Sequence, residues 1–247
     1  MTNHEDARGT VARWTREARL AWALLALTIL CTGLTNAADD PQGTGERSSK
    51  ARFGMEAFWG SGSSSWHIGG FENVEGSFDG DASPWGFGLL VDNRGGGTFR
   101  YVTAISYEEW GDEEIEGDGN DPRIHLKTDG GLASDHRFDF DLVRRPHFRL
   151  ALGGPGVSLE VLHNELSGIV GGFRTRNDQS LTRVDLGAGA QVTAGFPFSW
   201  GEVTVTGSYR YTRSVYEDFG AGPIDDLTVK NHLYVLKLGL LFGSDAR

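Results

Sequence analysis

The sequence predicts an all-β protein, an eight-stranded antiparallel up-and-down β-barrel, on the strength of three observations. Apolar and polar residues alternate with a period of two through most of the chain after residue 50. Eight segments carry this pattern, and an even number lets a closed up-and-down barrel bring both chain ends to one side. Short and long connections alternate strictly between the segments, which gathers all the short turns at one end of the barrel.

Length and composition fit this fold. A chain of 247 residues is enough for one barrel domain and little else. Glycine is abundant at 36 residues and proline is scarce at 7, a mixture that suits strands and turns better than helices. The net charge of -11 argues against a general nucleic-acid binder, which needs a basic surface. Cys31 is the single cysteine, which excludes a disulfide framework and a cysteine zinc site.

The first residues are predicted to be an export signal. Three arginines precede an apolar run from Leu20 to Leu30, and small residues follow up to Ala38, as in a cleavable secretory signal peptide. The run is too short to span a bilayer comfortably, so a membrane anchor is the weaker alternative. The predicted order is a signal peptide (1–38), a flexible linker (39–50), the barrel (51–243) and a short tail (244–247).

Each of the first four predicted strands has an apolar face and a polar or small face. In the first, Phe53, Met55 and Trp59 alternate with Arg52 and Glu56. The second to fourth repeat this division with the apolar sets Trp85, Phe87, Leu89 and Val91; Phe99, Tyr101, Thr103, Ile105 and Tyr107; and Phe138, Phe140 and Leu142. A helix would mix the two sets, so strands are indicated.

The last four predicted strands cover residues 148–161, 183–194, 202–216 and 234–242. The clearest is 202–216, where every even position is polar and the odd positions are largely apolar. The strand at 148–161 changes parity across Gly153-Gly154-Pro155-Gly156, which predicts a β-bulge that resets the register.

The connections predict which end of the barrel faces which compartment. Residues 93–97, 144–147 and 197–201 are short links, whereas 60–83, 110–133, 163–181 and 217–230 are long and are predicted to be loops. Bacterial outer-membrane barrels have short periplasmic turns and long outward loops. The acidic stretch 112–129 would then face outside as a solvated loop, without the spacing of a calcium loop.

Three features favour a barrel with its apolar face outward, in lipid, over a soluble lipocalin-like carrier with an apolar interior. Aromatic residues cluster at both ends of the apolar face, as in interfacial girdles: Trp59, Trp85, Tyr107 and Tyr216 beside the long connections, and Phe53, Phe99, Tyr101, Phe148, Phe196 and Phe242 near the short turns. The polar face carries both charge signs in near balance. It predicts a structural charge network inside the barrel, formed by Arg52, Glu56, Arg100, Glu108, Arg137, Asp139, Asp141, Arg149, Glu160, Arg183, Asp185, Glu202, Arg210 and Lys237.

The third feature is the last strand, Lys237 to Phe242, which resembles the C-terminal signal read by the outer-membrane assembly machinery. It departs from that pattern at Ser244, where an aromatic is usual, and in the residues that follow. Residues 51–243 as a whole resemble the small eight-stranded outer-membrane barrels of the OmpA/OmpX-like superfamily. The resemblance implies a transmembrane β-barrel in the bacterial outer membrane, in contact with lipopolysaccharide. It does not choose among structural barrels, surface-interaction factors and lipid-modifying enzymes.

The leading functional hypothesis is a monomeric, non-enzymatic barrel whose interior is filled by paired charges. Its long acidic loops would give it a structural or surface-interaction role. The runner-up is an enzyme similar to the lipid A deacylases, with His163 and Ser167 as the nearest candidates, although their spacing of four differs from the spacing of two in those enzymes. His136 is predicted to face lipid, without a serine at hand. No catalytic residue, cofactor or metal ligand is assigned, and the soluble carrier ranks third.

Overall fold

The computed structural model describes residues 51–71, 74–94, 98–117, 123–170, 173–174, 179–219 and 226–243. The predicted signal peptide, linker and tail lie outside these residues. No helix in this part of the chain is long and apolar enough to cross a membrane.

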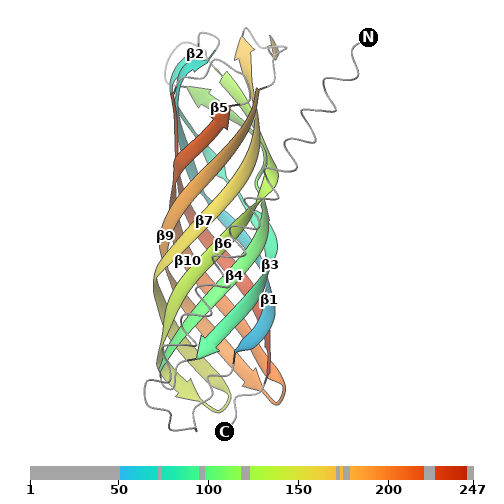
Figure 1. Ribbon diagram of the computed structural model, residues 1–247, viewed down its shortest axis with the longest axis vertical. Coiled ribbons are helices and arrows are strands. Elements are labelled where there is room, and N and C mark those ends of the chain that lie inside the picture. Colours follow the sequence, from blue (N-terminus) through green and yellow to red (C-terminus); the bar gives the residue numbers. More distant parts are fainter. Residues whose placement is uncertain are drawn as a thin grey trace, which may run out of the picture. The chain divides into compact units, whose positions relative to one another are not determined.

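Eight strands form a closed antiparallel ring, which confirms the predicted fold (Figure 1). Around the ring they are β1 (Arg52–Phe71), β3 (Trp85–Arg94), β4 (Phe99–Glu109), β6 (Arg123–Arg145), β7 (Phe148–Val170), β9 (Gln179–Phe198), β10 (Gly201–Phe219) and β11 (Asp226–Phe242). The ring runs β6-β4-β3-β1-β11-β10-β9-β7, and pairing of β6 with β7 closes it. Closure leaves none of these eight strands with an open edge along the ring.

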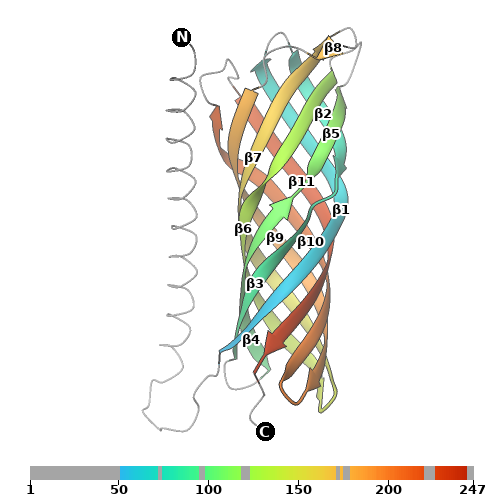
Figure 2. The same cartoon turned by 90° about the vertical axis from the view of Figure 1, so that its right-hand side faces the viewer.

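Two further strands lengthen the ring at one end. β2 (Val74–Ala82) precedes β3 and pairs with the upper half of β1, while β5 (Gly111–Gly117) continues from β4 and pairs with β6. β2 and β5 also pair with each other, at Phe78 with Gly117. The short β8 (Phe173–Arg174) pairs with the end of β7. Figure 2 shows β2, β5 and β8 together at the end away from the tight turns.

The four connections expected to be long loops are therefore mostly strand, and that prediction was wrong. Two strands extend into these connections from below, since β1 continues to residue 71 and β7 to residue 170. Two others begin inside them, since β6 starts at residue 123 and β11 at residue 226. Residues 111–117 and 123–129 of the acidic stretch also lie in strands, and residues 118–122 lie outside the described part. The physical reason is that these segments are rich in small and polar residues, which hide the alternation on which the strand predictions depended.

The wall of the lower barrel has the predicted inverted polarity. Phe138 is 41% exposed and Leu236 is 49% exposed, whereas Arg137 and Lys237 are only 6% and 8% exposed. Phe53, Phe140 and Leu238 are exposed in the same way. Apolar side chains thus cover the outside and charged side chains fill the inside, the opposite of a soluble barrel. The soluble-carrier alternative fails on this observation.

This polarity reverses further up the barrel. Beyond Trp59, the outward positions of β1 are exposed serines followed by His67, while Trp66 and Ile68 point inward and are buried. Buried Phe58, Ala82, Trp110, Leu162, Leu233 and Val235 pack together as an apolar core. We call this part, which includes residues 60–71 of β1, β2 and residues 226–233 of β11, the upper tier. It is built like a soluble barrel, with a polar surface and large apolar side chains inside, beside a buried hydrogen bond between Ser64 and Asn231.

The change of polarity marks a bilayer boundary. Trp59 and Trp85 are direct cross-strand partners, and both are half-exposed at this level. Paired tryptophans are typical of the membrane–water interface. Tyr101, which was expected in the opposite girdle, is instead buried against His136 and Phe138.

The predicted β-bulge is present. The pairing of β7 with β9 shifts register between Gly153 and Gly156, and Gly154 has a φ of +141°. Glycine is favoured at this position because L side chains seldom adopt a positive φ. The bulge restores the outward direction of the apolar residues on the upper half of β7.

Candidate functional site

Six buried side chains cross the lower end of the barrel. Three arginines on β1, β4 and β7 meet three carboxylates on β3, β6 and β10, so formal charges cancel. This lower cluster consists of Arg52, Arg100, Arg149, Asp92, Asp141 and Glu202, each no more than 5% exposed. Because the six come from six strands, the cluster ties together most of the ring.

The contacts in the lower cluster are short and shared. Arg52 donates to Asp92 and, over 2.8 Å, to Glu202. Arg149 Nε donates to Glu202 Oε1 over 2.7 Å, and its Nη1 donates to Asp141 Oδ1 over 3.2 Å. Arg100 Nη1 lies 3.1 Å from Asp92 Oδ2. Each carboxylate therefore faces at least two guanidinium groups, which offsets the cost of removing these charges from water.

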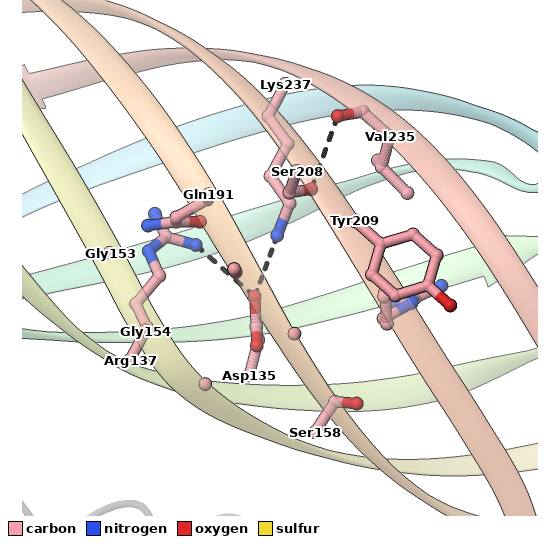
Figure 3. A pocket seen from close by; sticks show the side chains of 14 residues that line it. Asp135, Arg137, Gly153, Gly154, Ser158, Gln191, Ser208, Tyr209, Val235 and Lys237 are labelled. Carbon is pink, nitrogen blue, oxygen red and sulfur yellow. Dashed lines mark hydrogen bonds and ion pairs between the residues drawn. The ribbon is translucent and has the colours of Figure 1, made fainter.

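A middle cluster lies beside the bulge and is shown in Figure 3. Lys237 Nζ donates to Asp135 Oδ2 over 2.7 Å, and Arg137 Nη1 approaches the same oxygen at 3.4 Å. Arg137 also lies 3.7 Å from Glu56. A cavity of about 30 Å³ adjoins these side chains. A space of this size holds about one water molecule.

An upper cluster completes the charged interior. Arg210 makes a two-pronged ion pair with Glu108, with N–O distances of 2.8 and 3.0 Å, and lies 3.2 Å from Glu160. Arg183 lies 2.8 Å from Asp185 and places its guanidinium 4.7 Å from the ring centre of Trp66. The charged interior thus ends against the aromatic and aliphatic core of the upper tier.

The structure places all fourteen predicted charged residues inside the barrel. Thirteen are buried, and the side chain of Arg210 is 11% exposed. Sequence reasoning missed Asp92 and Asp135, which each contact two cationic residues. The alternation could have found both, because each lies on the face of its own strand opposite the apolar residues, Asp135 with Arg137 and Asp92 opposite Val91. Among the described residues, no group of three or more metal-ligating side chains gathers.

On the outer wall, the structure brings together a serine and a histidine that sequence reasoning had separated. Ser134 Oγ lies 2.9 Å from His136 Nε2, and Tyr101 Oη lies 2.7 Å from His136 Nδ1. The statement that His136 has no serine at hand was therefore wrong. It overlooked Ser134, two residues away on the same face of β6. Ser134 is fully buried.

The pair proposed from sequence, His163 and Ser167, cannot form such a contact. Both lie on β7, which is a continuous strand from residue 148 to residue 170. Four residues along a strand span about 13 Å, which is far beyond the reach of a hydrogen bond.

The closed ring, the exposed apolar wall and the buried charges decide the class. The protein is a bacterial outer-membrane β-barrel. In such barrels the tight turns face the periplasm, and here they lie at residues 146–147 and 199–200.

Neither a protein-family model nor a curated protein matches the sequence. The chain is similar to several solved structures. The outer membrane protease OmpT of Escherichia coli has 10% identity and a TM-score of 0.45, over 81% of this chain and 100% of its own. Neisserial surface protein A has 13% identity and a TM-score of 0.36, over 78% of this chain and 99% of its own. The attachment invasion locus protein Ail of Yersinia pestis has 15% identity and a TM-score of 0.37, over 77% of this chain and 99% of its own.

Proposed function

We propose that this outer-membrane barrel is a closed, non-enzymatic, monomeric membrane platform that carries the upper tier at the cell surface for a structural or interaction role. The observation that carries the proposal is the lower cluster, whose six charges are buried and mutually paired across the lumen. An eight-stranded barrel has an interior just wide enough for side chains. Ions would have to break buried pairs to pass.

The surface role rests on the upper tier rather than on long acidic loops. Its outer face is polar, and its interior is packed with apolar side chains such as Trp66, Phe78 and Leu233. A packed interior makes this part a rigid extension of the membrane barrel, suited to holding a fixed binding surface beyond the acyl chains of the lipid. We propose lipopolysaccharide and, during insertion, the outer-membrane assembly machinery as its partners.

Electrical recording tests the closed interior. Purified protein is refolded in detergent, its folding is checked by heat-modifiable migration on a gel, and it is inserted into planar bilayers. Because the lower cluster blocks the lumen, we expect no stepwise conductance at moderate voltage. Regular ohmic steps from folded protein, as a water-filled pore gives, would overturn the proposal.

A second candidate function is ester hydrolysis at the outer wall, as in a lipid-modifying enzyme. The observation that favours it is the hydrogen-bonded chain Ser134–His136–Tyr101, in which a histidine lies between a hydroxyl nucleophile and an orienting group. Burial of Ser134 opposes it, because a substrate carbonyl must reach the serine oxygen.

A fluorophosphonate probe, which reacts covalently with activated serines, separates the two functions. For a non-enzymatic barrel we expect no labelling above that of Ser134→Ala. Labelling of the wild-type protein that disappears in both Ser134→Ala and His136→Ala would favour the enzyme. The two variants change side chains on the outer wall, so conductance of the lumen is an independent measurement.

A further inference from the structure

Three cross-strand pairs on the outer face of β10 and β11 form a graded surface. Tyr209 pairs with Tyr234, Tyr211 with His232, and Arg213 with Lys230, in that order away from the tight turns. Arg213, Lys230, His232, Tyr209 and Tyr234 are all exposed. This tyrosine–cation patch starts next to the apolar wall at Leu236 and ends on two positive charges.

Within the described part of the chain, the two cations at the end of the patch face each other without a counter-ion. Directly opposed residues on antiparallel strands have Cβ atoms about 5 Å apart, and like charges there repel. Their outer neighbours are neutral, Ser65 beside Lys230 and Leu186 beside Arg213. Ser65 in turn donates its hydroxyl hydrogen to Asp79, which therefore lies one strand further away. Among the described residues, neither cation takes part in an ion pair.

The histidine below the cations is held in place by a hydrogen bond at one of its two ring nitrogens. His232 Nδ1 lies 2.7 Å from the hydroxyl of Tyr209, and its ring centre lies 5.0 Å from that of Tyr211. Within the described part of the chain, Nε2 makes no hydrogen bond. When Tyr209 donates to Nδ1, Nε2 carries the ring proton and is a hydrogen-bond donor.

The two tyrosines of the patch indicate where it lies relative to the membrane. Tyr209 and Tyr234 pack at 5.5 Å between ring centres, one residue pair beyond the last apolar pair of β11. Tyrosines are enriched at the headgroup level of a membrane because their rings are apolar and their hydroxyls are polar. The two cations stand four residues above Tyr234, at a level where lipid headgroups rather than acyl chains lie against the wall.

We propose that this patch binds the phosphate group of an outer-leaflet lipid, a phosphomonoester of the lipid A type. A phosphate between Arg213 and Lys230 replaces their mutual repulsion with two attractions, and arginine suits phosphate because it donates two parallel hydrogen bonds. His232 adds a third donor, and the tyrosines contact the apolar part of the same molecule. This inference deepens the lipid contact proposed above by naming its chemistry and its residues.

Lipid binding by the refolded full-length protein tests the proposal. The protein in uncharged detergent is titrated with bisphosphorylated lipid A in mixed micelles, and with the same lipid after enzymatic removal of its phosphates. We expect R213Q/K230Q to weaken binding of the phosphorylated lipid about tenfold or more, since two charge-assisted contacts are lost. Dephosphorylation should weaken wild-type binding similarly and leave the variant nearly unaffected.

The controls make each outcome decisive. R144Q/R145Q removes two exposed arginines at the opposite end of the barrel and should bind like the wild type. R213K/K230R keeps both charges and should retain most of the affinity. Equal binding of lipid A by wild type and R213Q/K230Q, or equal binding with and without lipid phosphates, would overturn the proposal. So would inorganic phosphate binding as tightly as the lipid. None of these results bears on conductance, so the closed-barrel proposal stands or falls separately.

Discussion

Arg100→Ala is expected to lower the free energy of unfolding by about 3–5 kcal/mol, the loss typical of removing one partner from a buried ion-pair network. Arg100 is 1% exposed and lies 3.1 Å from Asp92 and 3.5 Å from Asp141. The substitution leaves three carboxylates facing two guanidinium groups, in a space that water reaches poorly. One buried negative charge is then left uncompensated, in surroundings that screen it weakly.

Urea titration of the protein refolded in lipid vesicles, followed by tryptophan fluorescence, measures this loss. Arg145→Ala is the matched control because it also removes an arginine, but from an exposed position beside a turn, where the expected change is within about 0.5 kcal/mol. Similar midpoints for the two variants would mean that the lower cluster does not hold the ring together. Arg100→Lys should recover part of the loss, since a lysine keeps the charge but not the forked geometry.

The membrane part of the fold could be predicted because alternation is a local property. Residues two apart on a strand share a face whatever the rest of the chain does. Phe138 and Phe140 therefore had to lie opposite Arg137 and Asp139. Balanced charges on one face then distinguished a lipid-facing barrel from a soluble one, and the exposed fractions confirm this polarity.

The upper tier could not be predicted in the same way, because small residues hide the period of two. From Gly60 to Ser63, β1 alternates glycine inside with serine outside, and Ser64 and Ser65 continue with serine on both faces, a pattern that looks like a flexible loop. Gly62 is required there: a Cβ atom would collide with the backbone oxygen of His232 on β11. Trp66, Ile68 and Phe78 were the available signal, since large apolar residues two apart on a strand indicate a buried face.

The alternation along each strand predicted which charged residues lie inside the barrel, but not which of them contact one another. Arg52 and Glu202 are 150 residues apart and meet only because β1 pairs with β11 and β11 with β10 around the closed ring. Which arginine meets which carboxylate depends on the shear of that ring, which no local pattern encodes. Asp92 was missed because the other inward residues of its strand are Gly86, Gly88 and Leu90, so the strand carried no charge pattern.

Leu89→Arg is expected to cost about 2–4 kcal/mol of folding free energy in a bilayer, the loss typical of arginine on the lipid face at mid-depth. Leu89 is 69% exposed and lies on β3 midway between Trp85, at the boundary, and Asn93, near the lower turn. In a soluble barrel an arginine at so exposed a position would cost almost nothing, so the size of the loss reports on the surrounding solvent.

Ser63→Arg provides the contrast. Ser63 is exposed on β1, four residues beyond Trp59, where the outer wall has become polar. There we expect a change within about 0.5 kcal/mol, as for most surface substitutions. Both variants are measured by urea titration in the same vesicles. A loss at Ser63 as large as that at Leu89 would place lipid around the upper tier, and the boundary at Trp59 and Trp85 would be wrong. Negligible losses for both variants would mean that lipid surrounds neither position. The exposed apolar side chains of the lower wall would then have no explanation.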